Sequence, residues 1–130
     1  MPQVPKYDLA KVKQIAEQYL AGKRDVVLFS APSRSLHCVV EVLLCDDEEA
    51  PNHIATGILN LEPQAFCERV LQWDTTMDVY GLEDFQNIDW YVKFCLEEIE
   101  GELHLEQVSF HPLEKPMRLA DGRLIQPRNV

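Results

Sequence analysis

The chain has 130 residues, of which 46% are hydrophobic and 26% are charged. This length and composition suit one globular domain spanning residues 1–130. There is no run of about 18 apolar residues that could span a bilayer, and the N-terminus lacks the apolar centre of a signal peptide. We therefore expect a cytoplasmic protein without membrane contact. The formal net charge of -10 argues against RNA as the main partner, because nucleic-acid binders normally show a basic surface.

The acidic residues are concentrated in the middle of the chain. Residues 41–106 hold seventeen acidic and two basic side chains, whereas residues 1–40 and 107–130 each carry a small basic excess. An acidic surface would attract a basic protein partner and speed their encounter, although the same charges could serve solubility alone. The residues predicted to bind such a partner are Asp46, Asp47, Glu48, Glu49, Glu97, Glu98 and Glu100.

The four cysteines lie inside apolar stretches and form no CxxC pair. We expect reduced, packed thiols, because free cysteine is among the most buried residue types. The cysteines and the four scattered histidines lack zinc-ligand spacing. The acidic stretch at residues 46–52 lacks the alternating oxygen ligands and the glycine of a calcium loop. The sequence thus predicts neither a metal site nor a cofactor.

The first half of the chain predicts helices and one short strand. Asp8 can cap a helix over residues 9–21, because its carboxylate can accept from the free N–H groups of the first turn. Residues 26–29 are long enough only for a strand or an extended connector. Residues 36–45 suit either a helix capped by a preceding serine or a strand rich in β-branched valine, with the helix slightly favoured.

The middle of the chain combines a loop, an ambiguous segment and a predicted helix. Residues 46–52 are polar and predict an exposed loop, while residues 53–60 are apolar and fit a helix or a strand. A second helix is predicted to begin near Pro63, since proline is tolerated in a first turn. Phe66, Val70 and Trp73 would form its packing face.

The second half predicts strands. Residues 77–80 suggest one strand, and Ile88 to Phe110 predicts a hairpin around Gly101 in which apolar residues alternate with polar ones. The apolar phase slips along the return strand, so we expect a bulge near Glu106 or Gln107. A terminal hairpin is predicted around residues 121–122. Together these elements predict an α+β domain, with a small antiparallel sheet and helices packed on one of its faces.

The known phosphate-loop, hydrolase and metalloprotease motifs are absent from the sequence. One group of residues could still carry chemistry. Tyr91 and Lys93 share a face of their strand, and the return strand should bring Ser109 and His111 within cross-strand reach. A phenol, an ammonium group and an imidazole could act as acid, base and charge stabiliser toward a phosphodiester. A polar sheet face without catalysis is the alternative.

Three short motifs mark the second half: DVY at residues 78–80, WYVKF at residues 90–94 and VSFH at residues 108–111. They resemble the C-terminal half of the MqsR toxin family, which are RelE-fold messenger-RNA interferases. Weaker matches are KVKQIAEQYLAG at residues 11–22, SRS at residues 33–35 and ILNLEPQAF at residues 58–66. The resemblance implies a RelE-like sheet with helices on one side.

The same resemblance implies an altered catalytic set. Tyr91 stands where the family keeps a catalytic tyrosine, and His111 stands where it has a functional lysine. Glu68 replaces another catalytic lysine, and Met77 replaces a glutamine. Because a carboxylate in place of a cation inverts the charge of a phosphate site, we expect a non-catalytic interaction protein, such as a toxin-antitoxin or immunity-like component. A metal-independent endoribonuclease using Tyr91, Lys93 and His111 is the alternative.

Overall fold

The computed structural model describes residues 3–29 and 33–127. Helix α1 (Leu9–Leu20) begins as predicted, because the Asp8 carboxylate accepts a hydrogen bond of 3.0 Å from the N–H of Ala10. The chain leaves this helix through Gly22, whose φ of +117° lies in the region that favours glycine. The apolar stripe of α1 is buried, as expected for a helix packed on a core.

Two further helices follow. Helix α2 (Arg34–Leu43) is capped by the Ser33 hydroxyl, which accepts a hydrogen bond from the N–H of Leu36. The favoured helical interpretation of residues 36–45 is therefore confirmed. Helix α3 (Ala50–Leu59) settles the open segment at residues 53–60 as helix. The predicted loop at residues 46–52 is shorter than expected, because its last residues form the first turn of α3.

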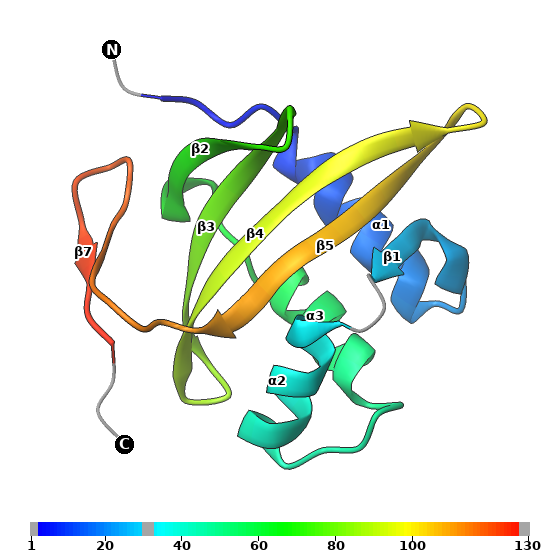
Figure 1. The fold of residues 1–130 in the computed structure, drawn as a ribbon, viewed down its shortest axis with the longest axis horizontal. Coiled ribbons are helices and arrows are strands. Elements are labelled where there is room, and N and C mark those ends of the chain that lie inside the picture. Colours follow the sequence, from blue (N-terminus) through cyan, green and yellow to red (C-terminus); the bar gives the residue numbers. More distant parts are fainter. Residues whose placement is uncertain (1–2, 30–32, 128–130) are drawn as a thin grey trace.

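The strands form a five-stranded sheet whose order is β1-β5-β4-β3-β2 (Figure 1). Four strands are antiparallel neighbours, while β1 runs parallel to β5 and makes the sheet mixed. One-turn 3-10 helices, η1 and η2, precede β1 and β2. The bounds are η1 (Arg24–Val26), β1 (Val27–Phe29), η2 (Pro63–Ala65), β2 (Phe66–Gln72), β3 (Thr75–Phe85), β4 (Ile88–Ile99) and β5 (Glu102–Pro112). The α+β class is thus confirmed.

The helix predicted from Pro63 to Trp73 is wrong. Pro63 begins only the single turn η2, after which residues 66–72 pair with β3. Phe66, Val70 and Trp73 are spaced in a way that fits a helix face, but six residues of the segment pair with β3 and make it a strand. A two-residue turn at Trp73 and Asp74 joins the two strands, and both residues have positive φ angles.

Two predictions for the second half are refined by the register. Lys93 pairs with Ser109 and Phe94 pairs with Gln107, so the extra residue of the bulge is Val108. The predicted bulge exists but lies one residue further along than expected. The terminal hairpin is confirmed as β6 (Met117–Arg118) paired with β7 (Leu124–Ile125).

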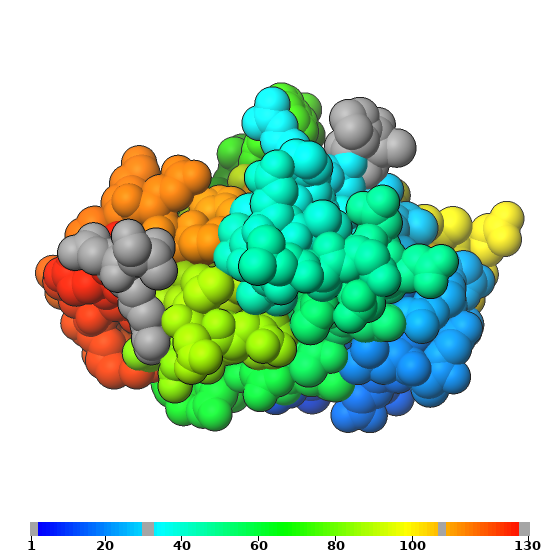
Figure 2. Space-filling view, turned by 90° about the horizontal axis from the view of Figure 1, so that it is seen from below, coloured from blue at the N-terminus to red at the C-terminus, as the bar shows by residue number. Residues whose placement is uncertain are grey.

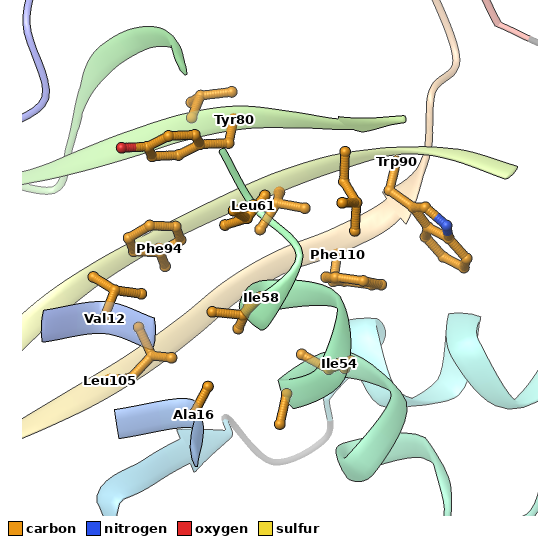
Figure 3. Close-up of a cluster of buried hydrophobic side chains, with 14 of the residues drawn as sticks. Val12, Ala16, Ile54, Ile58, Leu61, Tyr80, Trp90, Phe94, Leu105 and Phe110 are labelled. Atoms are coloured by element: carbon orange, nitrogen blue, oxygen red, sulfur yellow. The ribbon is translucent and has the colours of Figure 1, made fainter. Parts of the chain in front are cut away.

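The hydrophobic core lies between the helices and one face of the sheet (Figure 3). Trp90 and Phe110 are fully buried there, with ring centroids 4.8 Å apart. The indole N–H of Trp90 donates to the carbonyl of Phe85 at 2.9 Å, which satisfies its polar atom. Figure 3 shows Ile54 and Ile58 of α3 facing these sheet residues. We call this the core face of the sheet.

Gly57 allows α3 to lie close to the core face. A Cβ atom there would come within 2.7 Å of the Phe110 ring, which is itself buried. We expect Gly57→Ala to lower the free energy of unfolding by about 1–2 kcal/mol, because overpacking outweighs the helix-propensity gain. Urea denaturation would measure the change. The matched control is Thr56→Ala in the same helix, which should be neutral or slightly stabilising; equal stability of Gly57→Ala and wild type would contradict this packing.

Candidate active site

Tyr91 and Lys93 lie on the sheet face opposite the helices. They alternate along β4 with Trp90, Val92 and Phe94, which all point into the core. The register places Tyr91 opposite His111 and Lys93 opposite Ser109 on β5. The cross-strand proximity predicted from the sequence is therefore present. We call this the site face of the sheet.

A pocket of about 530 Å³ lies on the site face. It gathers side chains from β2, β4 and β5 and from the segment that follows β5. Its lining residues are Cys67, Glu68, Tyr91, Lys93, Ser109, His111, Leu113, Glu114, Lys115, Pro116, Met117 and Arg118. All three residues that the sequence proposed for catalysis therefore line one open pocket.

The chain beyond β5 forms one wall of this pocket. It turns back over the site face and is fixed to the edge of β2 by a hydrogen bond of 2.7 Å from the Ala120 N–H to the Phe66 carbonyl. Gly81 on β3, the neighbour of Tyr91, makes room for it: a Cβ there would lie 2.8 Å from Ile125 and 2.9 Å from Met117. The C-terminal hairpin thereby brings Lys115 and Arg118 to the pocket.

Tyr91 and His111 stack on each other, with ring centroids 5.0 Å apart and planes 10° from parallel. The Nδ1 atom of His111 lies 2.8 Å from the backbone carbonyl of Pro112. Because a carbonyl only accepts, Nδ1 must carry a proton there, and Nε2 is the nitrogen that can gain or lose one. The stack and this hydrogen bond fix the orientation of the imidazole ring.

Glu68 faces the same pocket. It pairs with Val79 on β3, which places it in the cross-sheet row that also contains Lys93 and Ser109. Burial raises the pKa of Tyr91, and the charges of Glu68 and Cys67 raise it further. Tyr91 is therefore a neutral phenol at physiological pH and can donate a hydrogen bond. A carboxylate, a phenol and an imidazole thus share one pocket.

Lys93 crosses the site face toward β2. Its Nζ donates a hydrogen bond of 2.8 Å to the Oε1 atom of Gln72. Burial lowers its pKa from the ordinary value, because the charged ammonium loses part of its hydration. Lys115 and Arg118 bring the lysine and arginine side chains of the lining to three, against the two carboxylates of Glu68 and Glu114. The lining therefore has a formal excess of one positive charge, although the net charge of the chain is acidic.

The acidic residues predicted to bind a partner occupy two separate places. Asp46 and Glu49 cap each other's backbone at the start of α3: the Glu49 N–H donates to Asp46 at 2.8 Å, and the Asp46 N–H donates to Glu49 at 3.3 Å. Asp47 and Glu48 are exposed beside them. Figure 1 places this loop apart from the β4–β5 end, which carries Glu97, Glu98 and Glu100. The seven acidic residues therefore do not form one continuous surface.

The space-filling view shows the arrangement of these parts (Figure 2). The β4–β5 end, in yellow, protrudes from the outline of the molecule, and the C-terminal segment, in orange and red, lies at the other end. Binding of a basic partner by the acidic residues stays a prediction, and such a partner would have to choose between the two acidic groups.

The cysteines agree with expectation in being free thiols, with Cys95 buried and the other three half-buried. Within residues 3–29 and 33–127, no group of three or more histidine, cysteine or acidic side chains is placed to hold a metal ion. No helix in the same ranges is long and apolar enough to cross a membrane.

Sequence reasoning missed several residues of the pocket. Lys115 and Arg118 follow the last long strand in a segment with no recognisable motif, and only their position after a short turn could have suggested that they fold back. Glu68 was expected on a helix rather than a strand. Met77 lies on β3, is 5% exposed and does not line the pocket.

The chain was compared with family models, curated proteins and solved structures, and none of them matches it. The similarity to the MqsR family therefore rests on the short motifs alone. Of these motifs, WYVKF and VSFH supply Tyr91, Lys93, Ser109 and His111, which is the set that meets in the pocket.

Proposed function

We propose that the protein is a metal-independent endoribonuclease whose active site is the pocket on the site face. The observation that carries this proposal is the meeting of Tyr91, Lys93 and His111 with Glu68 in one open pocket. The four come from three strands, so the sheet rather than sequence proximity brings them together. A cytoplasmic location and a toxin-like role belong to the same proposal.

The residues are suited to cleavage through the 2′-hydroxyl of RNA. Glu68 would accept the proton of that hydroxyl as its oxygen attacks phosphorus, and the bond from phosphorus to the 5′-oxygen would break. His111, protonated at Nε2, would donate its proton to the leaving 5′-oxygen. The products are a 2′,3′-cyclic phosphate and a 5′-hydroxyl. Such paired proton transfer contributes about 10²–10⁴-fold to a rate.

The cations and the phenol would stabilise the charge that develops on the phosphoryl oxygens. Lys93, Lys115 and Arg118 line the pocket from two sides, and Tyr91 offers a neutral O–H group. Donors that are placed in advance around developing charge are among the strongest contributors to catalysis. Glu68 stands where the MqsR family has a catalytic lysine, which argued against catalysis. In this proposal Glu68 acts as a base, and Lys93, Lys115 and Arg118 supply the positive charge.

Tyr91→Phe tests the proposal. The purified protein should cleave a long single-stranded RNA in the presence of a chelator, and Tyr91→Phe should lower the rate about 10-fold or more, because it removes one donor without opening a cavity. The measurement is the rate of fragment formation with end-group analysis for the cyclic phosphate. Tyr19→Phe is a matched control, because Tyr19 is buried against the core and should leave the rate unchanged. Absence of cleavage by the wild type would overturn the proposal.

A basic protein partner is the second candidate, and the observation that favours it is the exposure of all seven predicted acidic residues. Of the two sets of acidic residues, the one at the protruding β4–β5 end is the more accessible. Replacing Glu97, Glu98 and Glu100 with glutamine should weaken binding of an oligolysine peptide more than replacing Asp47 and Glu48. Calorimetric titration at two salt concentrations would measure this, since such binding falls as salt screens the charges.

A further inference from the structure

Trp73 is the largest of the exposed hydrophobic side chains in the described part of the chain. Its side chain is 84% exposed, and the neighbouring Leu71 is 72% exposed. Trp73 stands at the turn between β2 and β3, in the central pair of a two-residue hairpin loop. Large aromatic side chains that remain in water commonly mark a binding surface. Neither the core nor the pocket accounts for this indole.

The backbone at this turn does not favour tryptophan. Trp73 has a φ of +50° and Asp74 a φ of +62°, which is the conformation of a tight hairpin turn that prefers Asn-Gly. A bulky residue adopts it only with strain. The conformation of the turn therefore does not explain why tryptophan stands here. A contact between its exposed side chain and a ligand would explain it.

Trp73 is connected to the pocket through its neighbour. The Gln72 side chain accepts a hydrogen bond of 2.8 Å from the Nζ of Lys93, and Lys93 lines the pocket. Because Trp73 follows Gln72 in the chain, its turn lies next to the Lys93 side chain and within reach of an extended single strand that occupies the pocket. A cation followed by an exposed aromatic ring is the combination that binds single-stranded nucleic acid, by phosphate attraction and base stacking.

We propose that Trp73 stacks on a base of single-stranded RNA held in the pocket, several nucleotides from the scissile phosphate. The inference rests on the proposed nuclease function and names its substrate as an extended single strand. Because stacking accepts any base, this contact selects unpaired RNA over duplex without selecting a sequence. The neighbouring Asp74 repels phosphates, so only the base and not the backbone should approach this turn.

The two tryptophans make the contact measurable. Trp90 is fully buried, whereas Trp73 is exposed, so iodide should quench only the Trp73 emission. We would titrate the wild type with an eight-nucleotide oligodeoxyuridine, which lacks the 2′-hydroxyl and cannot be cleaved by the proposed route. Bound oligonucleotide should quench Trp73 and protect it from iodide. Trp73→Ala should weaken binding by roughly 5- to 150-fold, the range found for loss of one stacked base.

Two variants sharpen the test. Leu71→Ala removes the neighbouring exposed apolar side chain and should bind the oligonucleotide like the wild type. The double variant Trp73→Asn with Asp74→Gly installs the preferred turn, so Tm should rise by about 3–5 °C, while its affinity should fall relative to Asp74→Gly alone by the same factor as in Trp73→Ala. A gain in stability together with a loss of binding separates a role in recognition from a role in folding.

The outcomes distinguish this inference from the nuclease proposal. Equal binding by Trp73→Ala and wild type overturns stacking, even if RNA is cleaved. Cleavage of long RNA without detectable binding or quenching also overturns it. Binding that depends on Trp73 without cleavage of RNA overturns the nuclease and leaves a single-strand binding site. If the protein neither binds the oligonucleotide nor cleaves RNA, both proposals are overturned.

Discussion

His111→Ala is expected to lower the rate of the proposed RNA cleavage about 10²–10⁴-fold, the contribution of a positioned general acid. The imidazole is held by its stack on Tyr91 and by the hydrogen bond from Nδ1 to the Pro112 carbonyl. These two contacts fix the direction in which Nε2 could donate a proton. The measurement is single-turnover cleavage of a labelled RNA. His37→Ala is the control, because His37 is an exposed residue of α2 that pairs with Glu41.

A change of the leaving group separates a general acid from a residue that only shapes the pocket. An RNA whose scissile 5′-oxygen is replaced by sulfur needs no proton from an acid, because a thiolate is a good leaving group. His111→Ala should therefore cleave this substrate at close to the wild-type rate. A loss of the same size on the oxygen and sulfur substrates would show that this imidazole transfers no proton.

Asp78→Ala is expected to lower the free energy of unfolding by about 3–5 kcal/mol, since a hydrogen bond to a charged group contributes roughly 1.5–3 kcal/mol. The Asp78 carboxylate is fully buried and accepts from two backbone N–H groups, those of Lys6 at 3.0 Å and Tyr7 at 2.9 Å. It therefore fixes the segment before α1 to the sheet. Urea unfolding monitored by circular dichroism would measure the loss.

Tyr7→Phe is the matched control for Asp78. The Tyr7 hydroxyl donates to the Thr76 carbonyl at 2.7 Å, which is a second link between the same two segments. Its removal should cost only about 0.5–1.5 kcal/mol, because both groups are neutral. Losses of equal size in the two variants would contradict the role given to the buried carboxylate. Asp78 is the first residue of the DVY motif, and its buried carboxylate gives this residue a role in folding.

The parts of the fold that local chemistry determines could be predicted from the sequence. The cap at Asp8, the alternation along β4 and the turn at Gly101 each depend on neighbours within a few residues. The segment after Pro63 could not be predicted in the same way, because its apolar residues are spaced four and three apart as on a helix, although it forms a strand. Its pairing with β3 decides the outcome, and a pairing partner is not visible in local periodicity.

The candidate site shows the same division. Tyr91, Lys93 and His111 could be proposed together because one hairpin register relates them. Lys115 and Arg118 could not, because their place depends on how the chain folds back beyond β5. That return depends in turn on Gly81, whose missing side chain makes room for Met117 and Ile125. A sequence pattern can identify each of these residues, but it does not show that they lie close together in the folded chain.

The wall that Lys115 and Arg118 add to the pocket follows the last strand of the five-stranded sheet in the chain. A variant shortened after Pro112 would keep the strand pairing of Tyr91 with His111. It would lose two of the three lysine and arginine side chains that line the pocket. The sheet and the positive charge of the pocket are therefore encoded in separate stretches of the chain.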